Sequence, residues 1–304
     1  MTASKRESRT YGSGRGACDE THVPTATLPS VPYPLRWLMS GSVVQTSLEN
    51  CICIITLNRP DALNALDRNL MVGLRDAVFA VEHDRAVRCV VIRGGEHFMA
   101  GGDIKWFSEL IEGRSANERT VLFQNLIHEV HGVIISLRRM PKPVIASVRG
   151  AVAGFGMSLM MACDLAIAAD NAYFTLAYTL IGASPDGGST FALPRSVGSK
   201  MAMEIALLGE RFDAVRAERL GLVNRVVPAA SLEAETMKLA TRLAQGPTTV
   251  YGRTKALLNS SLANVLETQL QREADALAQS AAEPDFAEGL RAFIEKRKPV
   301  FKGT

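Results

Sequence analysis

Two glycine-rich turns restrict what this chain can fold into, because each follows a strand pattern and precedes a helix pattern. One spans residues 97–103 and contains Gly101 and Gly102, and the other spans residues 150–156 and contains Gly154. Glycine lets the backbone turn tightly, and the first N–H groups of the following helix point back at the turn. Such turns either bind a ligand or simply connect packed layers, and the local pattern leaves both interpretations open.

Strand and helix patterns alternate between residues 43 and 227. Residues 43–47 and 51–57 are β-rich runs that predict a hairpin with its turn at 48–50. Asp67 is a favoured N-cap for the next helix, and a long amphipathic helix is expected over 118–139. This alternation predicts an α/β layered fold with right-handed crossovers.

The chain divides into three parts by composition. Residues 1–42 are rich in Ser, Thr, Gly, Arg and Pro, and we expect them to form a disordered arm. Residues 43–227 form the expected core, and residues 228–304 are almost wholly helical in pattern. No apolar run is long enough to span a membrane.

Composition and charge argue against several classes of function. The net charge of +3 is small and Lys and Arg are evenly spread, which argues against nucleic acid as a partner. The five cysteines are an odd count within apolar runs, so we expect reduced thiols and a cytoplasmic location. Neither Cys nor His residues have metal-ligand spacing, and no dinucleotide fingerprint follows the first strand. We therefore expect no metal site.

Asp186 lies in a turn fixed by Pro185 before it and by Gly187 and Gly188 after it. Its neighbours are apolar or small, which favours a carboxyl group with a raised pKa that exchanges protons with a carbon acid. A helix N-cap for the segment that begins at 188 is the alternative interpretation.

Five motifs, in order and spacing, resemble the enoyl-CoA hydratase/isomerase (crotonase) family. They begin with the Asn-Arg-Pro run and lie at 58–66, 98–104, 148–165, 174–189 and 295–301. The resemblance covers about residues 43–302 and implies a spiral of ββα units with a helical C-terminal trimerisation region. It also implies an acyl-CoA substrate, with CoA as the carrier part of the substrate and no separate cofactor, and a homotrimer or a dimer of trimers.

The resemblance also implies a site. In the family, two backbone N–H groups hold the thioester carbonyl, and the matching residues are Gly102 and Phe155. The positions that match the CoA-binding loops and a C-terminal contact, in a neighbouring subunit, are Ala62, Leu63, Ala100, Asp103, Lys298 and Phe301.

The chain departs from the hydratase pattern at two positions. Where hydratases carry two glutamates that activate water, this sequence has Ser158 and Tyr178. With Asp186 as proton carrier, it is similar instead to the isomerase branch that includes the epoxide isomerases of phenylacetate degradation. We therefore expect an acyl-CoA isomerase that uses Asp186 as its one base. Ser158 and Tyr178 are second choices among the catalytic residues, with hydroxyls that orient the acyl group or a water; for Tyr178, a place in the pocket wall is the alternative. Hydration by an atypical base, thioester hydrolysis and a non-enzymatic RNA-binding role are the alternatives, and the near-neutral charge argues against the last.

Overall fold

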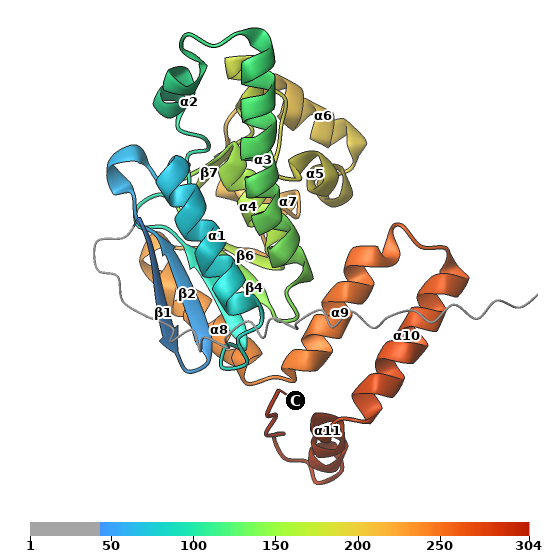
Figure 1. Ribbon diagram of the computed structural model, residues 1–304. Helices are drawn as coiled ribbons and strands as arrows, with labels where there is room; N and C mark the ends of the chain where they lie inside the picture. The colour runs from blue at the N-terminus through green and yellow to red at the C-terminus, as the bar shows by residue number, and fades with distance from the viewer. Residues whose placement is uncertain (1–42, 304) are drawn as a thin grey trace, which may run out of the picture. The chain divides into compact units, whose positions relative to one another are not determined.

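A six-stranded sheet forms the centre of residues 43–303, which are the residues that the computed structural model describes. The arm expected at 1–42 lies outside them. The strand order is β1-β2-β3-β4-β6-β9; β1 is antiparallel to β2, and the other neighbours are parallel (Figure 1). The strands are β1 Val44–Glu49, β2 Ile52–Leu57, β3 Cys89–Arg93, β4 Val144–Val148, β6 Leu165–Ala169 and β9 Arg225–Val227. The predicted α/β class is confirmed.

The predicted hairpin is present, but its turn was placed wrongly. The turn consists of Asn50 and Cys51, and Glu49 pairs with Ile52 across it. Both turn residues have positive φ, 50° and 63° respectively. A two-residue turn of this kind matches the right-handed twist of the paired strands. Leu48 and Glu49, predicted as turn residues, therefore remain paired within β1.

Side chains alternate along the strands and give each sheet face its own helical cover. Val90 and Ile92 of β3 pack in the core formed with α1 (Arg68–Glu82) and α3 (Ala116–Arg139). Cys89 and Val91 point to the other face, where α8 (Leu232–Ala244) packs against them. Both faces of the parallel strands are thus buried, as their near-continuous apolar sequences predict.

Shorter elements connect these layers. A second sheet has the order β5-β7-β8, with strands Ala151–Ala153, Tyr173–Thr175 and Phe212–Asp213. The short 3-10 helices are η1 Pro60–Ala62, η2 Tyr178–Ile181 and η3 Ala229–Ser231. The other helices up to residue 219 are α2 Ile104–Ile111, α4 Phe155–Ala162, α5 Ser189–Val197, α6 Ser199–Leu208 and α7 Ala214–Arg219.

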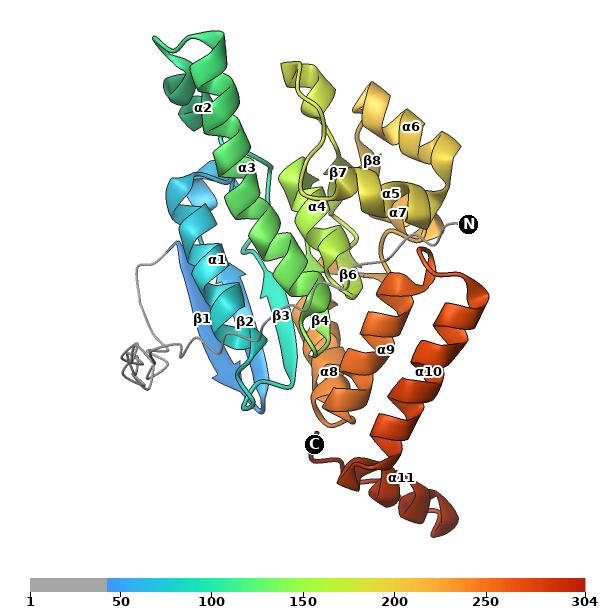
Figure 2. The ribbon, with the colours of Figure 1, turned by 45° about the vertical axis from the view of Figure 1, so that its right-hand side comes forward.

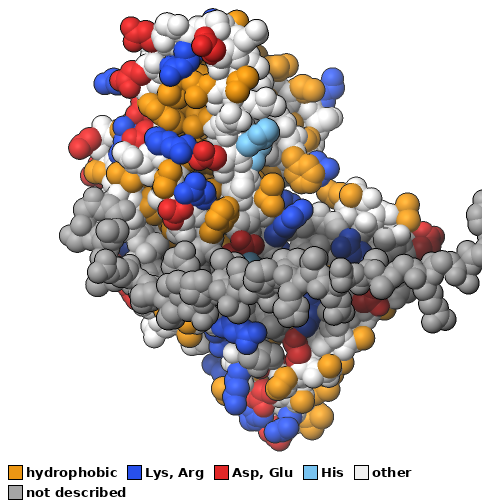
Figure 3. Space-filling view, in the orientation of Figure 1, with side chains coloured by type: hydrophobic (Ala, Val, Ile, Leu, Met, Phe, Trp, Pro, Cys, Tyr) orange, Lys and Arg blue, Asp and Glu red, His pale blue; other side chains and the backbone are white. Residues whose placement is uncertain are grey.

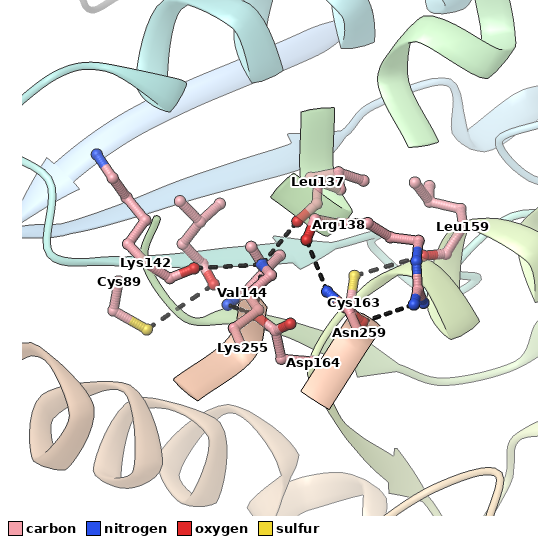
Figure 4. Close-up of polar contacts among 11 residues, drawn as sticks. Cys89, Leu137, Arg138, Lys142, Val144, Leu159, Cys163, Asp164, Lys255 and Asn259 are labelled. Carbon is pink, nitrogen blue, oxygen red and sulfur yellow. Dashed lines mark hydrogen bonds and ion pairs between the residues drawn. The ribbon is translucent and has the colours of Figure 1, made fainter. Parts of the chain in front are cut away.

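The predicted helical C-terminal region is present. After α8, it contains α9 (Thr248–Ser261) and α10 (Leu266–Ala281), which lie side by side, and α11 (Pro284–Ile294) (Figure 2). Helix α9 is attached to the core through Lys255, whose Nζ donates to Leu137 O at 2.7 Å and to Asp164 Oδ2 at 2.8 Å (Figure 4). The region therefore begins on the sheet itself and continues away from it.

Candidate active site

A largely apolar pocket of about 960 Å³ lies at the carboxyl ends of the parallel strands, beside α2 and α3. Figure 3 shows hydrophobic side chains gathered over α2 and the neighbouring part of α3. The walls of the pocket include the aromatic residues Trp106, Phe107 and Phe123. Among the predicted site residues, the structure brings the following together in this lining: Ala100, Gly102, Phe155, Tyr178 and Asp186.

The two glycine-rich turns meet at one end of the pocket. Gly154 has φ of +49°, which favours glycine, and a Cβ added there would lie in ordinary contact at 3.4 Å from Gly101 Cα, so the two turns are neighbours. Gly102 forms a parallel β-bridge with Leu66: the Leu66 N–H donates to Gly101 C=O, and the Asp103 N–H donates to Leu66 C=O. In such a bridge the N–H of the central residue, Gly102, points away from Leu66.

Two backbone donors remain available beside these turns. Phe155 is the first residue of α4, so its N–H has no intrahelical acceptor. Among the described residues, neither this N–H nor that of Gly102 donates to another backbone oxygen. Free backbone donors of this kind suit an oxygen atom that gains negative charge.

Asp103 fixes the first turn rather than facing the pocket. Its Oδ1 accepts from the N–H groups of Lys105 and Trp106 and so caps α2, while Oδ2 lies 2.7 Å from Arg59 Nη1. Burial raises the pKa of Asp103, but the hydrogen bonds from Arg59 and the helix N–H groups outweigh it and lower the pKa overall. The Asp103 side chain is not part of the pocket lining, so its predicted role in binding CoA remains a prediction.

Asp186 is the one carboxylate among the described residues that line the pocket. Tyr178 donates its hydroxyl proton to Asp186 Oδ1 at 2.5 Å. Burial raises the pKa of Asp186, and this hydrogen bond offsets only part of the increase. The N-cap alternative is wrong, because Gly188 occupies the N-cap of α5 with no side-chain cap.

Ser158 and Tyr178 differ in where they point. Tyr178 contacts the carboxylate itself, and burial together with the Asp186 charge raises the pKa of its phenol, so it stays protonated. Ser158 is buried outside the pocket lining, and its hydroxyl donates to the backbone C=O of Asp186 at 2.9 Å.

The other predicted CoA contacts fall into two groups. Ala62 and Leu63 form a loop beside the pocket, because Ala100 N–H donates to Leu63 C=O at 3.0 Å. Lys298 and Phe301 lie elsewhere: Phe301 C=O accepts from Arg88, which precedes β3, so they lie at the amino end of the strands (Figure 1). Within one chain they do not reach the pocket.

Sequence reasoning missed the histidine of this pocket. His131 of α3 lines it, and its Nε2 accepts from Gly187 N–H at 3.3 Å.

Within residues 43–303, no group of three His, Cys, Asp or Glu side chains could hold a metal ion. No helix in the same range is long and apolar enough to cross a membrane.

Comparisons with known proteins agree with these motifs. A family model described as enoyl-CoA hydratase/isomerase matches residues 47–304. The chain is 34% identical over 269 residues to the 1,2-epoxyphenylacetyl-CoA isomerase of Escherichia coli, covering 86% of this chain and 98% of that one. It is 36% identical over 255 residues to the crotonyl-CoA hydratase of Syntrophomonas wolfei, covering 83% and 95%. A crystal structure of an enoyl-CoA hydratase from Polaromonas sp. JS666 matches with a TM-score of 0.80 and 36% identity, covering 85% and 99%.

Proposed function

The chain belongs to the enoyl-CoA hydratase/isomerase family, and from this premise we propose that it is an acyl-CoA isomerase using one base. The observation that carries this proposal is the single carboxylate in the pocket lining, Asp186, with Tyr178 on one of its oxygens. Hydration by a pair of carboxylates needs a second acidic residue, and the described lining supplies none.

The proposed reaction moves one proton through an enolate. The N–H groups of Gly102 and Phe155 hold the thioester oxygen of the acyl-CoA, which stabilises the negative charge that develops there. Asp186 takes a proton from the carbon next to the thioester, and the bonding electrons pass to that oxygen as an enolate. The same carboxyl group then returns the proton further along the acyl chain, and the carbonyl re-forms. Atoms and charge balance without water or another reactant.

The surroundings of Asp186 suit this task. Tyr178 donates to Oδ1, which leaves Oδ2 as the oxygen free to take the proton. Burial raises the pKa of Asp186 and brings its basicity closer to that of the carbon acid, which favours proton transfer in both directions.

A panel of CoA thioesters tests the reaction type. The purified protein is incubated in heavy water with 3-enoyl-, 2-enoyl- and epoxyphenylacetyl-CoA, and product masses are recorded. Isomerisation gives a product with the substrate's composition, apart from any deuterium exchanged through Asp186. A product that has gained one water would establish hydration, and free CoA would establish thioester hydrolysis; either would contradict the proposal.

Replacing Tyr178 by Phe shifts the pH dependence of catalysis. The Tyr178 hydrogen bond lowers the pKa of Asp186, so its loss raises that pKa further. Because the base must be deprotonated, the acid limb of kcat/KM moves to higher pH in Tyr178→Phe. Tyr173→Phe, on β7 and outside the pocket lining, is the control. A limb at the same pH in both variants would show that Tyr178 has no influence on the base.

We propose that the protein assembles as a trimer or a dimer of trimers through its C-terminal helices. Large apolar side chains are exposed along α9, α10 and α11: Leu258, Leu262, Leu266, Leu270, Leu277, Leu290, Phe293 and Ile294. Phe293 is 86% exposed, and apolar surface of this extent marks a protein interface. In such an assembly, Lys298 and Phe301 would serve the CoA site of a neighbouring copy.

Light scattering tests the assembly. We expect the mass of a trimer or a hexamer, and we expect Leu262→Glu to reduce it, because a charge in a buried interface is costly. Exposed Leu207 of α6 supplies the control Leu207→Glu. A monomer across micromolar dilution of the unmodified chain would refute the assembly.

The buried cysteines fit a reducing compartment, and we propose the cytoplasm. Burial raises the pKa of the Cys53 and Cys89 thiols to about 12, which keeps them protonated and unreactive.

A further inference from the structure

The peptide group that joins Asp186 to Gly187 is hydrogen-bonded on both sides. Its C=O accepts from the hydroxyls of Ser158 and Ser189, each at 2.9 Å. Its N–H donates to Nε2 of His131 at 3.3 Å. Three side chains from three helices therefore fix the plane of this one peptide, and with it the direction of the Asp186 side chain.

The turn is also wedged against α4. Gly187 has φ of +59°, and a Cβ added there would lie 2.7 Å from Ser158 Cβ and 2.8 Å from Phe155 Cδ2. Only glycine fits both the conformation and the space. The turn is thus held by close contact and a hydroxyl on the α4 side, while the hydrogen bond on the α3 side comes from His131.

We propose that His131 is a positioning residue for the proton-transfer step: its imidazole anchors the Asp186–Gly187 peptide and so aims the Asp186 carboxylate into the pocket. This inference rests on the proposed function. An acceptor at Nε2 requires that the ring proton sits on Nδ1, so His131 acts with its lone pair. Without that acceptor the Gly187 N–H loses its partner, and the peptide is held only through its C=O and its contact with α4, which lets its plane tilt.

Rotation of this peptide moves the base. Asp186 Oδ2 must meet the substrate carbon while Gly102 and Phe155 hold the thioester oxygen. A misplacement of about 1 Å can cost about a hundredfold in rate. We therefore expect the loss of the His131 acceptor to lower turnover while substrate binding, which depends on the other pocket walls, changes little.

Two substitutions at His131 and one control test the assignment. His131→Leu removes the acceptor, whereas His131→Gln offers an amide oxygen in a similar place. His128→Leu is the matched control, because His128 lies one turn earlier on α3, is exposed and is outside the pocket lining. Turnover, KM and hydrogen exchange at the backbone amides of residues 186–189 are measured on the full chain.

We expect His131→Leu to lower kcat by about 10- to 100-fold with KM changed less than about threefold, and to speed amide exchange in the turn. His131→Gln should recover most of kcat and the slow exchange. Unchanged kcat in His131→Leu would overturn the assignment. Equal losses in both variants with unchanged exchange would also overturn it, because the ring itself would then act on the substrate. Full activity of Asp186→Asn would refute the proposed function, whereas a loss there with normal His131→Leu refutes only this inference.

Discussion

Asp186→Asn is expected to lower kcat by about a hundredfold or more while KM for the CoA thioester stays within a few-fold of its original value. The amide has nearly the shape of the carboxylate and still accepts a hydrogen bond from Tyr178, so the turn and the pocket wall are preserved. What it lacks is the basic oxygen that takes the proton. The loss therefore falls on the chemical step rather than on binding.

Steady-state kinetics on an active thioester, together with heavy-water exchange at the carbon next to the carbonyl, measure this effect. Exchange should fall in parallel with turnover, because both begin with removal of the same proton. Asp76→Asn on α1 is the control, since that carboxylate is exposed and outside the pocket lining. Near-normal turnover of Asp186→Asn would contradict the assignment of Asp186 as the base.

Much of the site can be predicted from the sequence because its parts follow strands. Residues after the neighbouring parallel strands β3 and β4 gather at one edge of the sheet, and a parallel bridge between Met99 and Val152 then brings the turns at Gly102 and Phe155 together. The Pro185 to Gly188 turn is likewise a strong local signal, and it places Asp186 in the same pocket.

His131 could not be found in this way. It lies within a long helix between the buried residues Val130 and Val133, and it is 56 positions from Gly187 in the sequence. The only sequence signal is a histidine on an otherwise apolar helix face, and such a residue is usually a satisfied core group. Ser158 shows the related difficulty, since its position was predicted but its bond to the Asp186 backbone depends on how α4 meets the turn.

The C-terminal residues show a different limit. Lys298 and Phe301 were assigned to CoA from a motif, and within one chain they lie at the opposite end of the strands from the pocket. Arg297 pairs with Glu288, and the backbone N–H groups of Lys302 and Gly303 donate to Asp285, so the tail is fixed against α11. A role for the tail in catalysis therefore depends on a second copy of the chain, which one sequence does not describe.

The second large effect is expected for stability, at the ion pair that attaches α9 to the core (Figure 4). Asp164 Oδ2 accepts from Val144 N–H and from Lys255 Nζ, each at 2.8 Å. Burial raises the pKa of Asp164, and Lys255 offsets part of that increase. The Lys255 side chain is 9% exposed and that of Asp164 25%, so the pair is partly buried, and removing one partner of such a charged hydrogen bond costs about 2 kcal/mol.

Lys255→Met should therefore lower the free energy of unfolding by about 2 kcal/mol and the melting temperature by about 4–8 °C. Without Lys255 the pKa of Asp164 in the folded state rises further above its value in the unfolded chain. The folded state then binds the proton more tightly, so the deficit is full at neutral pH and shrinks as the pH falls through the raised pKa. Urea unfolding of Lys255→Met at several pH values measures this dependence.

Two further variants separate the ion pair from general damage to α9. Lys238→Met removes a lysine whose side chain is 77% exposed, on α8, and should change the unfolding free energy by less than about 0.5 kcal/mol. Asp164→Asn combined with Lys255→Met removes the unpaired carboxylate charge itself, so it should recover part of the stability lost in Lys255→Met and abolish its pH dependence. If the single variant unfolds like the unmodified chain, or if the double variant is no more stable than the single one, α9 is held by its apolar contacts and by the Arg138–Asn259 hydrogen bonds rather than by this pair.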